Sequence, residues 1–223
     1  MGSDMHPVAF DIETTGFTID AEVTTVGFEL PLGAAVFLNT GSRPIDTPKL
    51  EQVCRERAGR TVQLTVAGTE TDLLDEVAEF LRTTCARRDY YLVGYNAEVW
   101  DGGFDISFLR TRYATNEQSW PFTLPYADLM PLFSDRINTQ VDEQTEVRDL
   151  DRVYEALIGE EHCDPFADSQ AAVGAWETEQ FANLLCHNIA DIGRTQALAE
   201  YAERYVPQSD FNMKNLEPPS FEP

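Results

Sequence analysis

Strand-like and helical segments follow one another along this chain in an order that few folds accommodate. Three strand-length apolar segments come first, at residues 7–12, 23–30 and 34–39, and a turn at residues 31–33 separates the last two. They predict an antiparallel β-meander. Helical and strand-like patterns alternate after it, and this order predicts an α/β fold with a mixed sheet and helices on both faces.

The alternating part of the chain begins near residue 60. Strands are expected at residues 61–66, 90–94 and 122–127, and helices at residues 71–87 with Thr71 as the cap, 104–113, 150–157 and 177–205. The stretch between residues 159 and 174 is typical of loops. Hydrophobic residues make up 43% of the chain, enough for one core, so residues 1–206 are expected to form a single domain and residues 207–223 a C-terminal tail on its surface.

The charge of the chain is far from balanced. There are 39 acidic and 16 basic residues, a formal net charge of −23, and Lys49 and Lys214 are the only lysines. With 13 Phe, 8 Tyr and 3 Trp the chain has too many aromatic residues for a disordered acidic segment. Such a surface repels itself at low salt, whereas at 1 M salt the Debye length falls to ~3 Å. We interpret this composition as adaptation to a high-salt cytoplasm.

The sequence favours neither a membrane nor a secreted location. No apolar run reaches 18 residues, and the first ten residues lack the basic and apolar regions of a signal peptide. The cysteines form no CxxC pair, which disfavours a zinc site and a disulfide framework; they are Cys54, Cys85, Cys163 and Cys186. We expect a cytoplasmic protein with reduced thiols and no membrane partner.

Two carboxylates stand at the end of the first apolar segment. Asp11 and Glu13 are two residues apart, so on a strand their side chains project from the same face. Adjacent anions repel, and Mg²⁺ or Mn²⁺ would remove that repulsion with the oxygen ligands that it prefers. The alternative is a solvated acidic strand end, which is the better explanation of this pair taken alone.

A further acidic candidate follows the short strand at residues 90–94. Asp105 stands where the next helix begins, and sites in open α/β sheets lie at the carboxyl ends of strands. An aspartate in the first turn of a helix is also common without any functional role. Asp101 is a nearby competitor. Asp105 is preferred because apolar residues Phe104 and Phe108 anchor its helix.

The last helix carries a histidine and an aspartate on one face. His187, Asp191 and Thr195 are spaced four residues apart, so they lie one turn from each other. A histidine one turn from a carboxylate can orient or deprotonate a metal-bound water. A surface His–Asp pair is an equally good reading of this spacing alone.

In combination, these segments resemble the motifs of a known family. FDIETTG at residues 10–16 resembles the first motif of the DEDD superfamily of 3′–5′ exonucleases, which includes the proofreading domains of DNA polymerases. GYN…FDISFL at residues 94–109 resembles the second motif, as found in family-B polymerases, and HNIAD…T at residues 187–195 the third. LDRVYEALIGE at residues 150–160 is similar to the helix before the third motif. The resemblance spans residues 8–205, and the chain looks like a stand-alone polymerase-B-like exonuclease.

This resemblance implies a ribonuclease H-like fold with a mixed five-stranded sheet. It implies hydrolysis of nucleic acid from a 3′ end. The sequence does not choose between DNA and RNA; single-stranded DNA is the favoured substrate, and a monomer is the favoured state. The positions of the four family carboxylates are occupied by Asp11, Glu13, Asp105 and Asp191, which would hold two divalent ions, Mg²⁺ or Mn²⁺. His187 stands where the family has either a tyrosine or, one residue earlier, a histidine that orients the attacking water. Asn188 matches no family residue.

Several residues near the motifs are expected to contact the substrate; they are Thr14, Phe17, Asn96, Arg110 and Arg194. Phe17 could stack on a terminal base or pack in the core. Arg110, Arg112 and Arg194 could bind phosphates or form ion pairs on helix surfaces. The main hypothesis is an active exonuclease. The alternatives are a non-catalytic nucleic-acid-binding module on the same fold and an endonuclease with the same metal chemistry.

Overall fold

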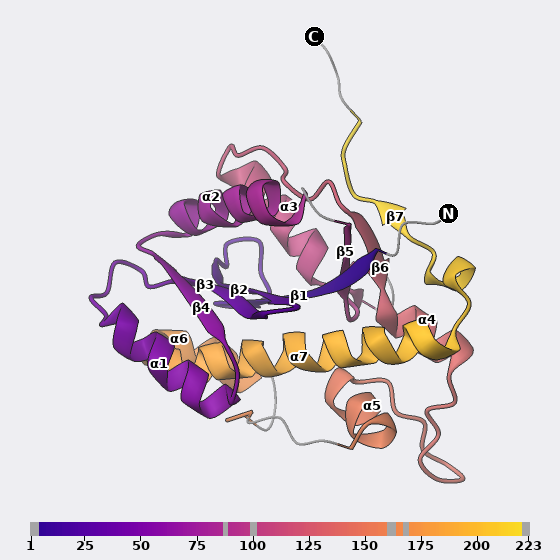
Figure 1. Cartoon of the computed structure of the whole chain (residues 1–223). Helices are drawn as coiled ribbons and strands as arrows, with labels where there is room; N and C mark the ends of the chain where they lie inside the picture. Colours follow the sequence, from indigo (N-terminus) through magenta and orange to yellow (C-terminus); the bar gives the residue numbers. More distant parts are fainter. Residues whose placement is uncertain (1–4, 87–88, 99–101, 160–163, 167–169, 220–223) are drawn as a thin grey trace.

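A seven-stranded mixed sheet forms the centre of the molecule (Figure 1). The computed structural model describes residues 5–86, 89–98, 102–159, 164–166 and 170–219. In spatial order the strands run β4-β3-β2-β1-β5-β6-β7. Their bounds are β1 His6–Thr14, β2 Val23–Leu30, β3 Gly33–Asn39, β4 Val62–Ala67, β5 Tyr90–Gly94, β6 Pro125–Asp128 and β7 Lys214–Asn215.

The expected meander is confirmed. β2 lies antiparallel between β1 and β3, whereas β5 pairs parallel with β1, and β6 parallel with β5. The described part of the chain has seven strands rather than the five expected. The sheet is wider because β4 pairs parallel with β3 at one edge and β7 pairs antiparallel with β6 at the other.

Helices cover both faces of the sheet, as the sequence predicts (Figure 1). The long helix α7 crosses β1 and β2 on one face and is flanked there by α1, α5 and α6, while α2 packs on the other face. The bounds are α1 Thr47–Ala58, α2 Glu70–Phe80, α3 Asp105–Thr115, α4 Leu129–Arg136, α5 Leu150–Leu157, α6 Gln170–Glu177 and α7 Phe181–Tyr205.

The sequence pattern misplaces several helix ends. The helix expected at residues 177–205 begins later, as α7 at Phe181, because Glu179 before it has a left-handed backbone with φ 58°. The separate helix α6 lies largely within the stretch expected to be loop. Thr69 rather than Thr71 caps α2, accepting a hydrogen bond from the Asp72 N–H. That helix ends at Phe80 and continues as one π-helical turn, Leu81–Cys85.

Two helices give too weak an apolar signal to be expected from the sequence. α1 buries Cys54 alone among its residues, so it has no apolar stripe, although Asp46 caps it and a proline follows in its first turn. α4 is only eight residues long and begins at its cap, Asp128. Short or polar helices of this kind are held by tertiary packing rather than by their own periodicity.

Alternation along β1 separates its apolar and acidic side chains. Val8, Phe10 and Ile12 belong to the apolar core on the α2 side of the sheet. The residues between them face α7, so Asp11 and Glu13 project together from that face. Pairing with β5 ends at Ala9, so beyond it β1 is paired with β2 alone and its carboxylates stand at the carboxyl edge of the sheet.

The C-terminal segment is more integrated than a surface tail. It adds β7 to the sheet, and it buries Phe211 and Leu216 in the two apolar cores. The indole N–H of Trp120 donates to the Leu216 carbonyl at 3.0 Å.

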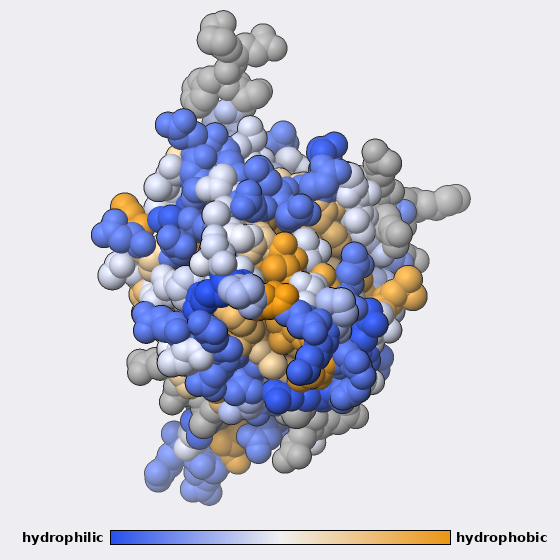
Figure 2. Space-filling view, turned by 90° about the vertical axis from the view of Figure 1, so that its left-hand side faces the viewer, coloured by the Kyte–Doolittle hydropathy of each residue, from blue (hydrophilic) through white to orange (hydrophobic). Residues whose placement is uncertain are grey.

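In the part of the chain that the structure describes, no helix combines the length and apolar character needed to cross a bilayer. The face in Figure 2 is largely hydrophilic around a central apolar group.

Gly27 sets how closely α7 approaches the sheet. Gly27 lies opposite Asp11 in the β1–β2 register, and a Cβ built on it would lie 2.0 Å from Oδ1 of Asn188 on α7. We expect Gly27→Ala to destabilise the protein by about 1 to 3 kcal/mol through overpacking, measured by denaturant unfolding.

Gly174→Ala is the matched control for this prediction. Gly174 is exposed on α6, and a Cβ there meets nothing within 4 Å. Alanine should be neutral or stabilising at this helical position. Equal stability of the Gly27→Ala and Gly174→Ala variants would show that the close approach of α7 is not needed.

Candidate metal centre

Four carboxylates from three separate parts of the chain meet at the carboxyl edge of β1. Asp11 and Glu13 come from β1, Asp105 is the first residue of α3, and Asp191 comes from the middle of α7. Asp105, Glu13 and Asp191 are each close enough to Asp11 to raise the pKa of its carboxyl group. The four candidate ligands are therefore neighbours. Asp101, the competitor of Asp105, lies outside the described residues.

The electrostatics of this cluster oppose its ionisation. Burial is the largest cause that raises the pKa of Asp11, Glu13 and Asp105, and repulsion among the carboxylates adds to it. Burial also raises the pKa of Asp191, although His187 and Arg194 act in the opposite direction. Glu13 is only 8% exposed, so the alternative of a solvated acidic strand end is wrong.

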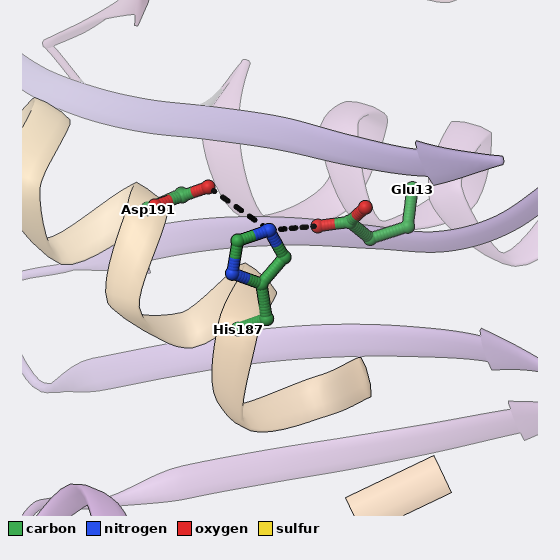
Figure 3. A group of neighbouring side chains, drawn as sticks. All are labelled: Glu13, His187 and Asp191. Atoms are coloured by element: carbon green, nitrogen blue, oxygen red, sulfur yellow. Dashed lines mark ion pairs between the residues drawn. The ribbon is translucent and has the colours of Figure 1, made fainter. Parts of the chain in front are cut away.

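His187 lies between two of these carboxylates (Figure 3). Its Nε2 atom is 3.6 Å from Oδ2 of Asp191 and 3.8 Å from Oε1 of Glu13. The side chain is buried, so it does not form the surface pair considered above. Although burial disfavours the charged imidazole, the hydrogen bond to Asp164 and the nearby Asp191 raise the pKa of His187. A protonated His187 imidazole would partly compensate the negative charge of the cluster.

Asp164 is a member of the site that sequence reasoning missed. Both of its carboxylate oxygens lie within 3.0 Å of Nδ1 of His187, and Nη1 of Arg194 donates to Oδ2 at 2.8 Å. The same Arg194 nitrogen donates to Oδ1 of Asp191 at 2.5 Å. Asp164 stands in a stretch expected to be loop, which carries no periodic pattern that could mark it. The preceding residues, His162 and Cys163, lie outside the described part.

Asn188 also has a place in the site, although it matches no family position. Its side-chain Nδ2 donates to Oδ2 of Asp11 at 2.9 Å and to the Asp11 carbonyl at 3.2 Å. Asn188 is fully buried. This amide therefore fixes the orientation of the Asp11 carboxylate from the α7 side. In the sequence, only its position next to His187 indicates that Asn188 could belong to the site.

The turn before α3 is organised by Asp128 at the end of β6. The Asp128 carboxylate accepts hydrogen bonds from the backbone N–H groups of Asn96, Ala97 and Glu98, at 2.8 to 3.2 Å. Asn96 has a left-handed backbone, with φ 55°. This turn leads the chain from β5 toward Asp105. Asp128 therefore helps to position Asp105, a candidate ligand that is distant from it in the sequence.

Two cavities open on the carboxylate cluster. Asp11, His187 and Asp191 line both, the smaller of about 150 Å³ and the larger of about 470 Å³. Thr14, Phe17 and Phe104 complete one side of the smaller cavity, and Asn96 and Arg194 belong to the larger.

Phe17 is not a core residue. Its side chain is 67% exposed and meets the Phe104 ring edge-on, with centroids 5.5 Å apart. The core-packing alternative for Phe17 is therefore wrong. Thr14, by contrast, is buried and its hydroxyl donates to the Gly16 carbonyl at 2.7 Å, so it shapes the turn beside the smaller cavity.

The arginines considered for phosphate binding are engaged in ion pairs. Arg110 pairs with Glu98 at 3.1 Å, outside the lining of both cavities. Arg112 is buried and makes a two-pronged pair with Glu70, at 2.8 and 2.6 Å. Arg194 lies in the larger cavity, where it pairs with Asp164 and Asp191 as described above. Of the three, Arg194 alone is placed beside the cluster.

The donor set of the cluster fits divalent cations. Carboxylate oxygens are the preferred ligands of Mg²⁺ and Mn²⁺, and a cation removes the repulsion that adds to burial in raising these pKa values. Glu13, His187 and Asp191 each offer one ligand atom, and these three atoms lie within 4.8 Å of one another. These three atoms are therefore candidate ligands of one ion.

Comparisons with known proteins do not identify the chain. No protein-family model matches it, and no curated protein matches it. These comparisons give no support to the resemblance of its motifs to the DEDD exonucleases. Function is therefore inferred from the geometry of the cluster and from the chemistry of its residues.

Replacing Asp105 by asparagine is expected to stabilise the metal-free protein at neutral pH. A carboxyl group whose pKa is raised by folding keeps its proton to a higher pH in the folded chain than in the unfolded chain. Stability therefore falls as the pH rises from about 4 through the raised pKa. Asp105→Asn removes this loss and should raise the thermal midpoint at pH 7 by about 2 to 4 °C, equivalent to ~1 kcal/mol at this chain length.

The measurement is thermal unfolding in EDTA at several pH values. The difference between Asp105→Asn and the unaltered protein should shrink as the pH is lowered toward 4. Asp75→Asn, at an exposed position on α2, is the control and should change the midpoint little. A lower midpoint for Asp105→Asn than for Asp75→Asn at pH 7 would contradict the account of the cluster.

Proposed function

We propose that this protein is a metal-dependent 3′–5′ exonuclease that hydrolyses phosphodiester bonds of nucleic acid, with single-stranded DNA the favoured substrate. The observation that carries the proposal is the convergence of Asp11, Glu13, Asp105 and Asp191 at one edge of the sheet, with His187 among them. These residues come from three distant motifs, and chance acidic residues would not be expected to meet in this way.

A ribonuclease H-like fold is part of the same proposal. The support for it is the mixed sheet, in which the meander β1-β2-β3 continues through β1 into the parallel strands β5 and β6, with helices on both faces. The strands β4 and β7 extend this arrangement at its edges. A high-salt cytoplasmic location, on the grounds of composition, and a monomeric state complete the proposal.

The carboxylates would hold two divalent ions, Mg²⁺ or Mn²⁺. As the resemblance implies, Asp11 would serve both ions, Glu13 and Asp191 would complete one site, and Asp105 would support the other. When bound, the ions lower the pKa of a water and stabilise the oxygen that leaves the phosphorus. Asn188 keeps Asp11 oriented, and Arg194 keeps Asp191 oriented, so both carboxylates are preorganised.

His187 and Phe17 both line the smaller cavity, where a scissile phosphate would lie. The family places at the position of His187 a group that orients the attacking water, and His187 faces both cavities. The exposed ring of Phe17 offers a surface for stacking of the terminal base. Stacking is suited to a chain of net charge −23, because basic contacts gain little from counterion release at molar salt.

Asp11→Ala is expected to lower the rate of cleavage by at least about 10³-fold, a loss of ~4 kcal/mol of transition-state stabilisation. The measurement is digestion of a 5′-labelled single-stranded oligonucleotide, as DNA and as RNA, with Mn²⁺ or Mg²⁺ in about 2 M KCl. The unaltered protein should shorten it from the 3′ end, and EDTA should stop the reaction. Asp75→Asn should retain full activity.

Other outcomes of this experiment distinguish the alternatives. Binding of the oligonucleotide with no cleavage in either metal would indicate a non-catalytic module. Cutting of a circular single strand would indicate an endonuclease, because a circle has no 3′ end. Full activity of Asp11→Ala would refute the assignment of the metal centre.

Phe17→Ala is expected to weaken substrate binding without loss of stability. Stacking of one base on an aromatic ring contributes ~1 to 3 kcal/mol, so KM should rise roughly 5- to 150-fold. The thermal midpoint should change little because the side chain is exposed. Leu32→Ala is the control, since Leu32 is 83% exposed and lines neither cavity. An unchanged KM in Phe17→Ala would remove the stacking role.

A further inference from the structure

The imidazole of His187 is held in one orientation from behind. Nδ1 lies 2.9 and 3.0 Å from the two carboxylate oxygens of Asp164. A carboxylate only accepts, so Nδ1 carries a proton and donates it to Asp164. The Phe166 ring meets the imidazole edge-on, with centroids 5.5 Å apart, and the histidine is 4% exposed. The ring therefore has little freedom to turn.

The other ring nitrogen is aimed into the carboxylate cluster (Figure 3). Nε2 lies 3.6 Å from Asp191 and 3.8 Å from Glu13, which is too far for a hydrogen bond to either. Two neighbouring ligands bound ~2.1 Å from one ion lie about 3.0 to 3.4 Å apart. The spacing around Nε2 is therefore close to that of ligands around an ion, and a small inward movement would complete it.

Asp164 also helps to orient Asp191, the second candidate ligand beside Nε2 of His187. It accepts a hydrogen bond from Arg194, and Arg194 donates to Oδ1 of Asp191. The other oxygen of Asp191, Oδ2, is the one that faces His187. One carboxylate behind the site thus orients both an imidazole and a carboxylate in front of it. Metal-bound histidines in proteins have this kind of support on the nitrogen that does not bind the metal.

We propose that Nε2 of His187 is itself a metal ligand, that with Glu13 and Asp191 it forms a mixed nitrogen and oxygen site, and that Asp164 is its positioning residue. The proposal rests on the proposed function for the presence of the metal centre, and it assigns to His187 a role different from orienting water. The ion takes the place of any proton on Nε2.

A nitrogen ligand changes which ion the site prefers. Mg²⁺ binds oxygen ligands and keeps several waters, whereas transition-metal ions accept imidazole readily. This site should therefore select Mn²⁺ over Mg²⁺. Asp105 lies outside the His187 group, so the ion that it supports should discriminate less.

The test is pulsed electron paramagnetic resonance of Mn²⁺ bound to the full chain, which detects a nitrogen directly coordinated to the ion. The unaltered protein should give the nitrogen signal and His187→Gln should lose it. The chain has three histidines, so His6→Gln and His162→Gln are matched controls that should keep the signal. Denaturant unfolding of each variant establishes that it is folded.

Affinity for the metals alone gives a second readout. In calorimetric titrations, Asp164→Asn should weaken Mn²⁺ binding by about 10- to 100-fold, as loss of a supporting partner does, with a smaller effect on Mg²⁺. His187→Gln should show the same selective loss of Mn²⁺ affinity. An equal loss for both ions in these variants would mean that the imidazole supports the fold of the site without binding the metal.

The outcomes separate this inference from the proposed exonuclease activity. Digestion of the oligonucleotide by a protein whose bound Mn²⁺ shows no coordinated nitrogen would overturn the ligand role of His187 and leave the activity standing. A nitrogen signal without digestion would support the ligand role and overturn the activity. A folded protein that binds no Mn²⁺ would overturn both.

Discussion

The close packing of α7 against β1 and β2 is the contact on which the candidate site depends. It is possible because Gly27 has no side chain where Asn188 of α7 enters. Asn188 then reaches Asp11, and the neighbouring His187 reaches Glu13. A helix held further from the sheet would leave the β1 carboxylates without partners. The arrangement of the candidate ligands therefore depends on the close approach of the α7 and β2 backbones, which is possible because Gly27 on β2 has no Cβ.

The same packing brings buried carboxylates together, which is electrostatically unfavourable. The charged side chains around the site form two layers, the carboxylate cluster next to the sheet and Asp164 with its partners behind it. The carboxylates of the cluster are buried and repel, which raises their pKa values. Behind them, Asp164 accepts from both His187 and Arg194, and because of these hydrogen bonds its own pKa is lowered, although burial acts in the opposite direction. The layer next to the sheet is thus poorly compensated, whereas the layer behind it is well paired. In the proposed metal centre, a cation would relieve the repulsion in the front layer that no described side chain fully removes.

The sequence predicts what depends on short spacing and leaves out what depends on tertiary contact. Asp11 and Glu13 share a face because a strand alternates, and His187 and Asp191 share one because a helix turns every 3.6 residues, so both pairs could be predicted. Asp164 acts from a loop without periodicity. The helix α1 carries no apolar stripe. The edge strand β7 has two residues, and the exposure of Phe17 follows from the turn it occupies rather than from its composition, so none of these could be derived from the pattern.

The few basic residues are largely engaged in ion pairs, which would give bound metal ions a role in substrate binding in addition to their role in hydrolysis. Arg112 is buried against Glu70, Arg194 is shared by Asp164 and Asp191, and Arg60 pairs with Glu29. Arginines committed in this way cannot also draw a polyanion to the surface, and a net charge of −23 repels it. Molar salt screens that repulsion but adds no attraction. Divalent ions held by the cluster would then add positive charge at the point where a phosphate must bind, so in the proposed exonuclease they would contribute to productive binding as well as to hydrolysis.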